Sequence, residues 1–217
     1  MRRLSVTAAF LVVAVLCLRG QTAEASEYAQ LSFLNSHEIR SANTRVFAKW
    51  RDALQRSSEE RIREQSRTCK VTLFRACHYK DWQKFLDDIH NNDRWHQVVA
   101  VNRYMNTRQY VSDSRNWGVN DYWATPGEFM ARSGDCEDFA IAKYLSLRQL
   151  GWSDDELRVA VVWDLHLNVN HAVLIVYYDG RTWLLDNQIR QVVETESVRH
   201  YRPVFSINEK YWWRHRV

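Results

Sequence analysis

The chain has 217 residues and a formal net charge of only +4, so its charge indicates no nucleic acid or other polyanionic partner. Only 6 glycines and 2 prolines occur, which argues against disorder, repeats and long flexible linkers. This length suits one domain with a substantial core.

The first 25 residues have the pattern of an export signal. Arg2 and Arg3 precede an apolar run over residues 4–18, and Ala23-x-Ala25 offers the small side chains that a signal peptidase accepts. The run is shorter than the ~20 residues of a typical membrane span, although an uncleaved anchor is the alternative. We therefore predict cleavage after Ala25, a periplasmic protein, and a single domain over residues 26–217.

The first half of this domain is expected to be helical. Apolar residues recur at helical intervals over residues 36–65, which predicts one long or two short helices, and again over 81–89 and 93–105. Residues 106–122 are rich in Asn, Asp, Ser and Arg, and we expect an irregular segment there.

Two short helices with clear start signals are expected next. Thr125, Pro126 and Glu128 form the pattern of a capping box with proline at the first helical position. This helix should end near Gly134, after which Asp135 should cap a helix over residues 136–150.

The last third is expected to form an antiparallel sheet. Residues 157–163 and 171–178 are β-type runs, and Asp179-Gly180 predicts a tight turn into 181–186. Residues 203–207 could add an edge strand. Helices followed by such a sheet predict an α+β fold.

The cysteine count indicates one free thiol. Outside the leader there are three cysteines, Cys69, Cys77 and Cys136, and an odd number leaves one unpaired in an oxidising compartment. Cys69 and Cys77 could close a small loop, which would leave Cys136 free. There is no CxxC motif, and a zinc set around Asp164, His166 and His171 lacks a further Cys or His.

Cys136 is the candidate nucleophile. At the first turn of a helix, unpaired N–H groups and the helix dipole stabilise a thiolate, although many helical cysteines serve packing alone. Three carboxylates, Asp135, Glu137 and Asp138, would oppose the thiolate unless an imidazolium or a metal cation offsets them.

The predicted hairpin supplies an imidazole, from His171, and a carboxylate that can orient it, from Asp186. If Asp179-Gly180 is a two-residue turn, pairing runs back to His171 opposite Gln188, and His171 and Asp186 become diagonal neighbours on one face. A slip of one residue would separate them. Together with Cys136 they would form a Cys-His-Asp triad of the papain type, in which Asp186 orients His171.

Four stretches resemble the bacterial transglutaminase-like cysteine peptidases, including their LapG-type periplasmic members. They are Trp123-Ala-Thr-Pro-Gly-Glu-Phe, Gly134-Asp-Cys-Glu-Asp-Phe-Ala-Ile-Ala-Lys-Tyr, His171-Ala-Val-Leu and Leu184-Leu-Asp-Asn. The likeness covers roughly residues 81–187. It implies a transglutaminase-like, papain-like core with Cys136, His171 and Asp186 as the catalytic triad.

The resemblance also implies a cation and partners. Asp135 and Glu137 fall on calcium-binding positions of the family, with Asp138 a third ligand, and oxygen ligands suit Ca²⁺. The substrate implied is a large surface adhesin cut near its N-terminus, which releases cells from a biofilm. An inner-membrane cyclic di-GMP receptor is the implied inhibitor. Two alternatives remain open: a transglutaminase-type acyl transferase with the same triad, and a catalytically silent binding module.

Overall fold

The computed structural model describes residues 32–66 and 77–217. Its helices are α2 (Ala48–Gln65), α3 (His78–Ile89), α4 (Arg94–Met105), α5 (Asp113–Asn116), α6 (Pro126–Arg132) and α7 (Cys136–Gln149). Its strands are β1 (His37–Ser41), β2 (Leu157–Asp164), β3 (Val169–Tyr178), β4 (Arg181–Leu185), β5 (Val193–Glu194), β6 (Tyr201–Ile207) and β7 (Trp212–Arg216). The predicted α+β class is confirmed.

The helices start and pack as their sequences dictate. The Thr125 hydroxyl accepts the N–H of Glu128, and the Glu128 carboxylate accepts the N–H of Thr125, which completes the predicted capping box of α6. In α3 the buried residues Trp82, Leu86 and Ile89 recur at intervals of three and four. Helix α3 therefore packs through one apolar stripe, and the start of α6 is fixed by its own cap.

The described strands form one antiparallel sheet in the order β1-β7-β6-β2-β3-β4-β5. The β3–β4 turn is the predicted two-residue turn: Tyr178 pairs with Arg181, and both Asp179 (φ 54°) and Gly180 (φ 65°) have the positive φ of a type I′ turn. The register of this hairpin is therefore the one predicted from Asp179-Gly180.

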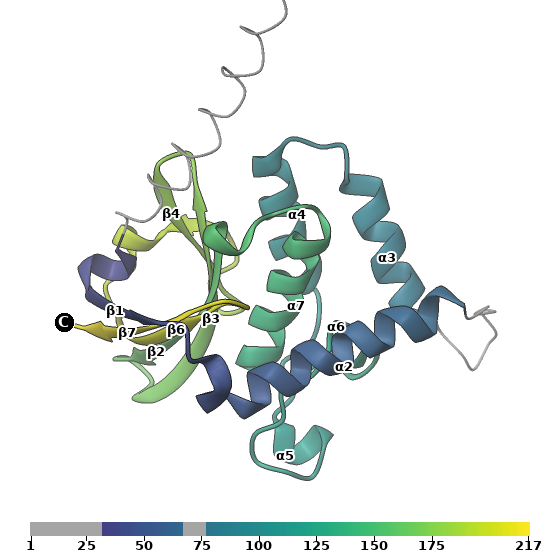
Figure 1. Ribbon diagram of the computed structural model, residues 1–217, viewed down its shortest axis with the longest axis horizontal. Coiled ribbons are helices and arrows are strands. Elements are labelled where there is room, and N and C mark those ends of the chain that lie inside the picture. Colours follow the sequence, from purple (N-terminus) through teal and green to yellow (C-terminus); the bar gives the residue numbers. More distant parts are fainter. Residues whose placement is uncertain (1–31, 67–76) are drawn as a thin grey trace, which may run out of the picture.

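Helix α7 lies between the sheet and the other helices (Figure 1). It is largely buried and packs on β3, where Ala172, Leu174 and Val176 belong to the main core cluster. A second cluster, which includes Val173, Ile175 and Tyr177, lies on the opposite side of the same strand. Both faces of β3 are thus buried, so the position of the helix start relative to this strand is tightly fixed.

Two predictions about the sheet need correction, and two of its strands were not predicted. Residues 36–65 are not all helical, because β1 precedes α2 and pairs with β7. Strand β6 was predicted as an edge strand, yet it lies between β2 and β7. Strands β5 and β7 were not predicted. The pairings of β1 with β7 and of β6 with β2 join segments that are distant in sequence, and local patterns do not reveal them.

The cysteines agree with one free thiol in the described chain. Cys77 is disulfide-bonded, whereas Cys136 is free. Cys69 and the leader lie outside the described residues, so the Cys69–Cys77 pairing and the signal peptide stay predictions. In residues 32–66 and 77–217, no helix has the length and apolar character needed to cross a bilayer.

Candidate active site

Cys136 is the first residue of α7, as the sequence predicts. Asp138 fixes this helix start: its two carboxylate oxygens accept the N–H of Ala124 at 2.7 Å and the N–H of Asp135 at 3.3 Å. The absence of a side chain at Gly134 leaves room for this carboxylate, because a Cβ there would lie 2.0 Å from Asp138 Oδ2. Asp138 therefore ties three segments together beneath the cysteine.

The thiol of Cys136 has two polar neighbours. Sγ lies 3.2 Å from Glu137 Oε2, to which it donates, and it accepts the backbone N–H of Ala172. Burial, and then the negative charge of Glu137, raises the pKa of the thiol. With the surrounding carboxylates ionised and no cation nearby, the neutral thiol is the favoured form.

His171 and Asp186 form the predicted pair. Imidazole Nε2 lies 2.8 Å from Asp186 Oδ1, and both side chains are buried. Although burial opposes it, the hydrogen bond from His171 holds the pKa of Asp186 below its usual value. The diagonal geometry expected of the hairpin is therefore present.

Two further residues hold this pair in place. The Tyr201 hydroxyl donates to Asp186 Oδ2 at 2.7 Å, and the Gln188 amide nitrogen lies 3.3 Å from His171 Nδ1. Gln188 was placed opposite His171 by the predicted register, but Tyr201 on β6 was not foreseen. With Nε2–H donated to Asp186, Nδ1 carries the single basic lone pair of the ring, which accepts the Gln188 amide in this structure and must be released from it to take a proton.

No hydrogen bond joins the thiol and the imidazole in the described structure. Cys136 and His171 are linked instead through Ala172, whose N–H contacts the sulfur and which directly follows His171. The structure thus joins His171 with Asp186 and places Cys136 beside the same strand. Rotation of the thiol away from Glu137 would be needed to bring it to the imidazole.

Five carboxylates gather around the start of α7. Ligand atoms of Asp113, Asp135 and Asp138 lie within 4.8 Å of one another, as do those of Asp113, Asp121 and Glu137. Oδ1 of Asp113 and Oδ1 of Asp135 are buried without a hydrogen-bond partner among the described residues. Such oxygens suit a hard cation, and the cluster fits Ca²⁺ in its donor type and number.

The segment over residues 106–122 carries two of these carboxylates to the site. Val111 N–H donates to the Gly134 carbonyl at 2.8 Å, and the Asn116 amide donates to the Ser133 carbonyl at 3.1 Å. Asp113 and Asp121 were missed because only this long-range docking brings them near Glu137. The segment is irregular as predicted, apart from the short helix α5.

Burial and mutual repulsion weaken the acidity of this cluster. Burial, and then contact with Glu137, raises the pKa of Asp135 to about 8. Burial raises the pKa of Asp138 to about 8 and that of Asp113 in the same direction. These carboxylates therefore repel one another when all are ionised.

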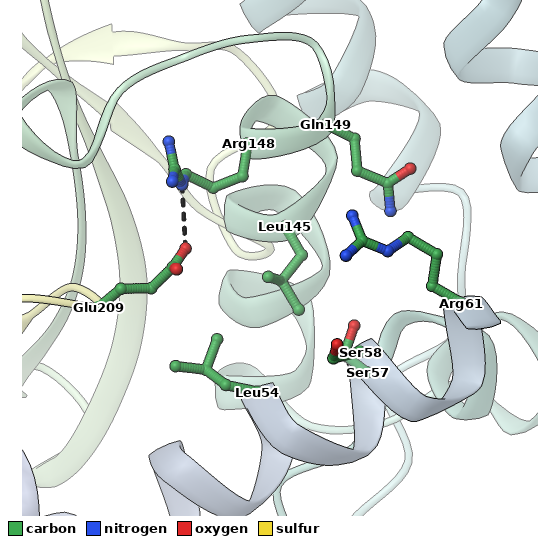
Figure 2. Close-up of a pocket in the computed structure, with 8 residues that line it drawn as sticks. All are labelled: Leu54, Ser57, Ser58, Arg61, Leu145, Arg148, Gln149 and Glu209. Atoms are coloured by element: carbon green, nitrogen blue, oxygen red, sulfur yellow. Dashed lines mark hydrogen bonds and ion pairs between the residues drawn. The ribbon is translucent and has the colours of Figure 1, made fainter.

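A separate pocket lies between α2 and α7, as Figure 2 shows. Leu54, Ser57, Ser58 and Arg61 line it from α2, and Leu145, Arg148 and Gln149 line it from α7. Glu209 closes one side and accepts a hydrogen bond from Arg148 at 2.9 Å (Figure 2). None of the residues around Cys136 lines this pocket.

Residues 67–214 match the family model of the bacterial transglutaminase-like cysteine proteinases. The chain belongs to this family. It is therefore a cysteine peptidase by family, as the sequence motifs indicated, and its α+β fold is the transglutaminase-like one. A comparison with curated proteins gave no match.

Solved structures of a family member resemble this cysteine peptidase. Legionella pneumophila LapG is 31% identical, with a TM-score of 0.58, over 63% of this chain and 77% of that one. Calcium-bound LapG from the same organism is 26% identical, with a TM-score of 0.59, over 76% of this chain and 86% of that one. An EGTA-treated form of LapG is 30% identical, with a TM-score of 0.59, over 64% and 77% of the two chains.

Proposed function

We propose that this cysteine peptidase is a calcium-dependent endopeptidase in which Cys136 is the nucleophile, His171 the general base and Asp186 the residue that orients His171. The observation that carries this proposal is the buried His171–Asp186 pair, which lies one residue from the N–H that contacts the Cys136 sulfur. Membership of a cysteine proteinase family supports the same roles.

The proposed reaction is acyl transfer to water. Nδ1 of His171 takes the thiol proton, and the Cys136 sulfur attacks a peptide carbonyl carbon. The tetrahedral species collapses to a thioester as the imidazolium gives its proton to the departing amine. Water, deprotonated by His171, then hydrolyses the thioester and releases the acid and the free thiol. Throughout, Asp186 holds Nε2–H and stabilises the imidazolium.

The start of α7 also supplies a donor for the oxyanion. Cys136 is the first residue of the helix, so its backbone N–H has no acceptor within the helix. This N–H, together with the positive end of the helix dipole, stabilises the negative charge that develops on the carbonyl oxygen.

We propose that Asp113, Asp121, Asp135 and Glu137 hold Ca²⁺, with Asp138 at the edge of the site. Two buried oxygens without partners and the calcium-bound LapG structure support this site. A bound cation would supply positive charge beside the thiol and order the segment over residues 106–122. The Glu137 carboxylate would then bind the cation and no longer accept the hydrogen bond from the thiol. Cys136 would be free to turn to His171.

We further propose a periplasmic location, a large surface adhesin as substrate, and inhibition by an inner-membrane cyclic di-GMP receptor. The support for all three is the resemblance of the site motifs to LapG-type members and the 31% identity to LapG. Cleavage near the N-terminus of the adhesin would release cells from a biofilm.

The triad is tested by incubating the protein with exported adhesin fragments in Ca²⁺. Cys136→Ala and His171→Ala should abolish cleavage, and Cys136→Ala should do so while its far-UV CD spectrum and thermal midpoint stay near wild type. His96→Ala, at an exposed histidine of α4, is the matched control and should cleave normally. Cleavage by Cys136→Ala at the wild-type rate would refute the assigned nucleophile.

The calcium site is tested by calorimetric titration of Ca²⁺ into EGTA-treated protein. We expect binding heat, a higher thermal midpoint and restored cleavage, with Mg²⁺ less effective because it demands a tighter octahedral site. Asp135→Ala, Glu137→Ala and Asp121→Ala should each weaken binding, whereas Asp155→Ala, at an exposed acid near β2, should not. Full activity in EGTA without binding heat would leave the carboxylates as helix-capping groups only.

A further inference from the structure

Three metal-binding side chains meet where β2 ends and β6 begins. Asp164 is the last residue of β2, His166 lies in the loop to β3, and His200 precedes β6. Asp164 pairs with Tyr201 across the two strands, and the Leu165 N–H donates to the His200 carbonyl at 2.8 Å. The backbone therefore fixes His200 beside the loop that carries His166.

The side chains converge as well as the backbone. A carboxylate oxygen of Asp164 and one ring nitrogen from each of His166 and His200 all lie within 4.8 Å of one another. The two imidazole rings are stacked, with centroids 4.5 Å apart and an interplanar angle of 5°. Neither ring has a hydrogen bond or an ion pair with another described residue, so their nitrogens are available to a ligand.

Backbone hydrogen bonds fix the orientation of the Asp164 carboxylate. Asp164 is 1% exposed, and its Oδ1 accepts the N–H groups of His166 at 2.8 Å and Leu167 at 3.1 Å. Its Oδ2 accepts no hydrogen bond from the described residues. Two backbone donors thus orient one oxygen, and the other has no donor among the described residues.

This donor set is distinct from the carboxylate cluster at Cys136. Two neutral imidazoles and one carboxylate favour Zn²⁺ and similar late first-row dications, whereas Ca²⁺ and Mg²⁺ favour oxygen donors alone. A site with three protein ligands keeps a fourth position for water. His166 is exposed, so its ring can move by the small distance that bonds of about 2.0–2.2 Å require.

We propose that Asp164, His166 and His200 form a binding site for Zn²⁺ or a similar transition-metal dication, separate from the calcium cluster. His200 directly precedes Tyr201, whose ring lies 4.2 Å from that of His200 and whose hydroxyl contacts Asp186. The metal would therefore fasten the β2–β3 loop to the start of β6, one residue from a contact of the His171–Asp186 pair.

The test uses the full mature chain with Cys136→Ser, which removes the thiol as a competing zinc ligand, in saturating Ca²⁺. Calorimetry with ZnCl₂ should show one tight site, and Co²⁺ should give the intense visible absorption of low-coordinate cobalt with imidazole ligands. Loss of a residue that only supports a metal ligand typically weakens binding about 10–100-fold, so removal of one of three ligands should weaken it at least about tenfold. We therefore expect this loss in His166→Ala and His200→Ala.

His96→Ala is the matched control, because His96 is an exposed histidine that is paired with Asp93. It should leave both readouts unchanged. His166 lies in an exposed loop, so its variant should fold even if His200→Ala does not, and CD spectra check this point. Equal zinc affinity in His166→Ala and the parent, or loss of the site in His96→Ala, would overturn the proposal. The measurement requires no peptidase activity and is independent of the proposed triad.

Discussion

Lys143 is a single residue whose chemistry the proposed reaction does not use. It lies on α7, its side chain is fully buried, and its Nζ has no hydrogen-bond partner in the described structure. Burial lowers the pKa of Lys143 to about 7, although the field of Asp186 opposes this change. A charged form of this lysine is therefore costly to bury near neutral pH.

We predict that Lys143→Met is more stable than wild type at pH 7, and that this advantage shrinks as pH rises. Between about 7 and 10.5 the unfolded chain holds the lysine proton and the folded chain does not, so wild-type stability rises with pH in this window. Urea unfolding of both proteins from pH 6 to 9.5 measures the difference. Lys80→Met, at an exposed position on α3, should show no such pH-dependent difference.

At the scale of elements, one carboxylate connects the long helix α2 to the start of α6. Glu60 is 8% exposed, and its Oε2 accepts the Gly127 N–H at 3.1 Å. A Cβ built on Gly127 would lie 2.1 Å from Glu60 Oε1. The approach of the buried Glu60 carboxylate to the Gly127 N–H therefore depends on glycine at this position.

We predict that Gly127→Ala lowers the free energy of unfolding by ~1–3 kcal/mol, the usual cost of overpacking. The same substitution should cost clearly less in a Glu60→Ala background, where the space is open. A double-mutant cycle by urea denaturation gives the coupling energy. Ala131→Gly, at an exposed position on α6, is the control and should show no coupling to Glu60→Ala. If Gly127→Ala cost the same in both backgrounds, its contact with Glu60 would not be the cause of the destabilisation.

The elements also show which features local sequence determines. The capping patterns predicted where α6 and α7 begin, and Asp179-Gly180 predicted the register that brings His171 to Asp186. Each of these signals acts within a few residues. By contrast, Tyr201, Asp113, Asp121 and His200 reach their sites through the β2–β6 pairing or a docked irregular segment. No local spacing encodes such contacts, so they could not be predicted from the sequence.

At the scale of the whole molecule, His215 joins the outer strands of the sheet. Its Nδ1 lies 2.7 Å from the Ser36 hydroxyl, and its Nε2 lies 2.9 Å from the Ser206 hydroxyl. Burial lowers the pKa of His215 to about 4, with Arg158 acting in the same direction and Glu38 against it. The neutral imidazole is thus the form that fits between β1, β6 and β7.

We predict that His215 makes the fold less stable as pH falls from 6.5 to about 4. In this window the unfolded chain gains the imidazole proton and the folded chain does not, so the contribution is present above pH 6.5 and lost on acidification. In thermal melts at constant Ca²⁺, the difference in thermal midpoint between wild type and His215→Gln should be smallest at the lowest pH. His37→Gln, at an exposed histidine of β1, should follow wild type throughout.

The pairing of β1 with β7 places the first and last strands of the described fold side by side. His37 lies opposite Arg216, so residues far apart in sequence are neighbours at one edge of the sheet. A linker across this edge, with new termini opened at Asp179-Gly180, would give a circular permutant with the same strand order. His171 and Asp186 would then stand near opposite termini of the chain while remaining adjacent on the sheet. Their proximity would depend on the sheet as a whole instead of on one tight turn.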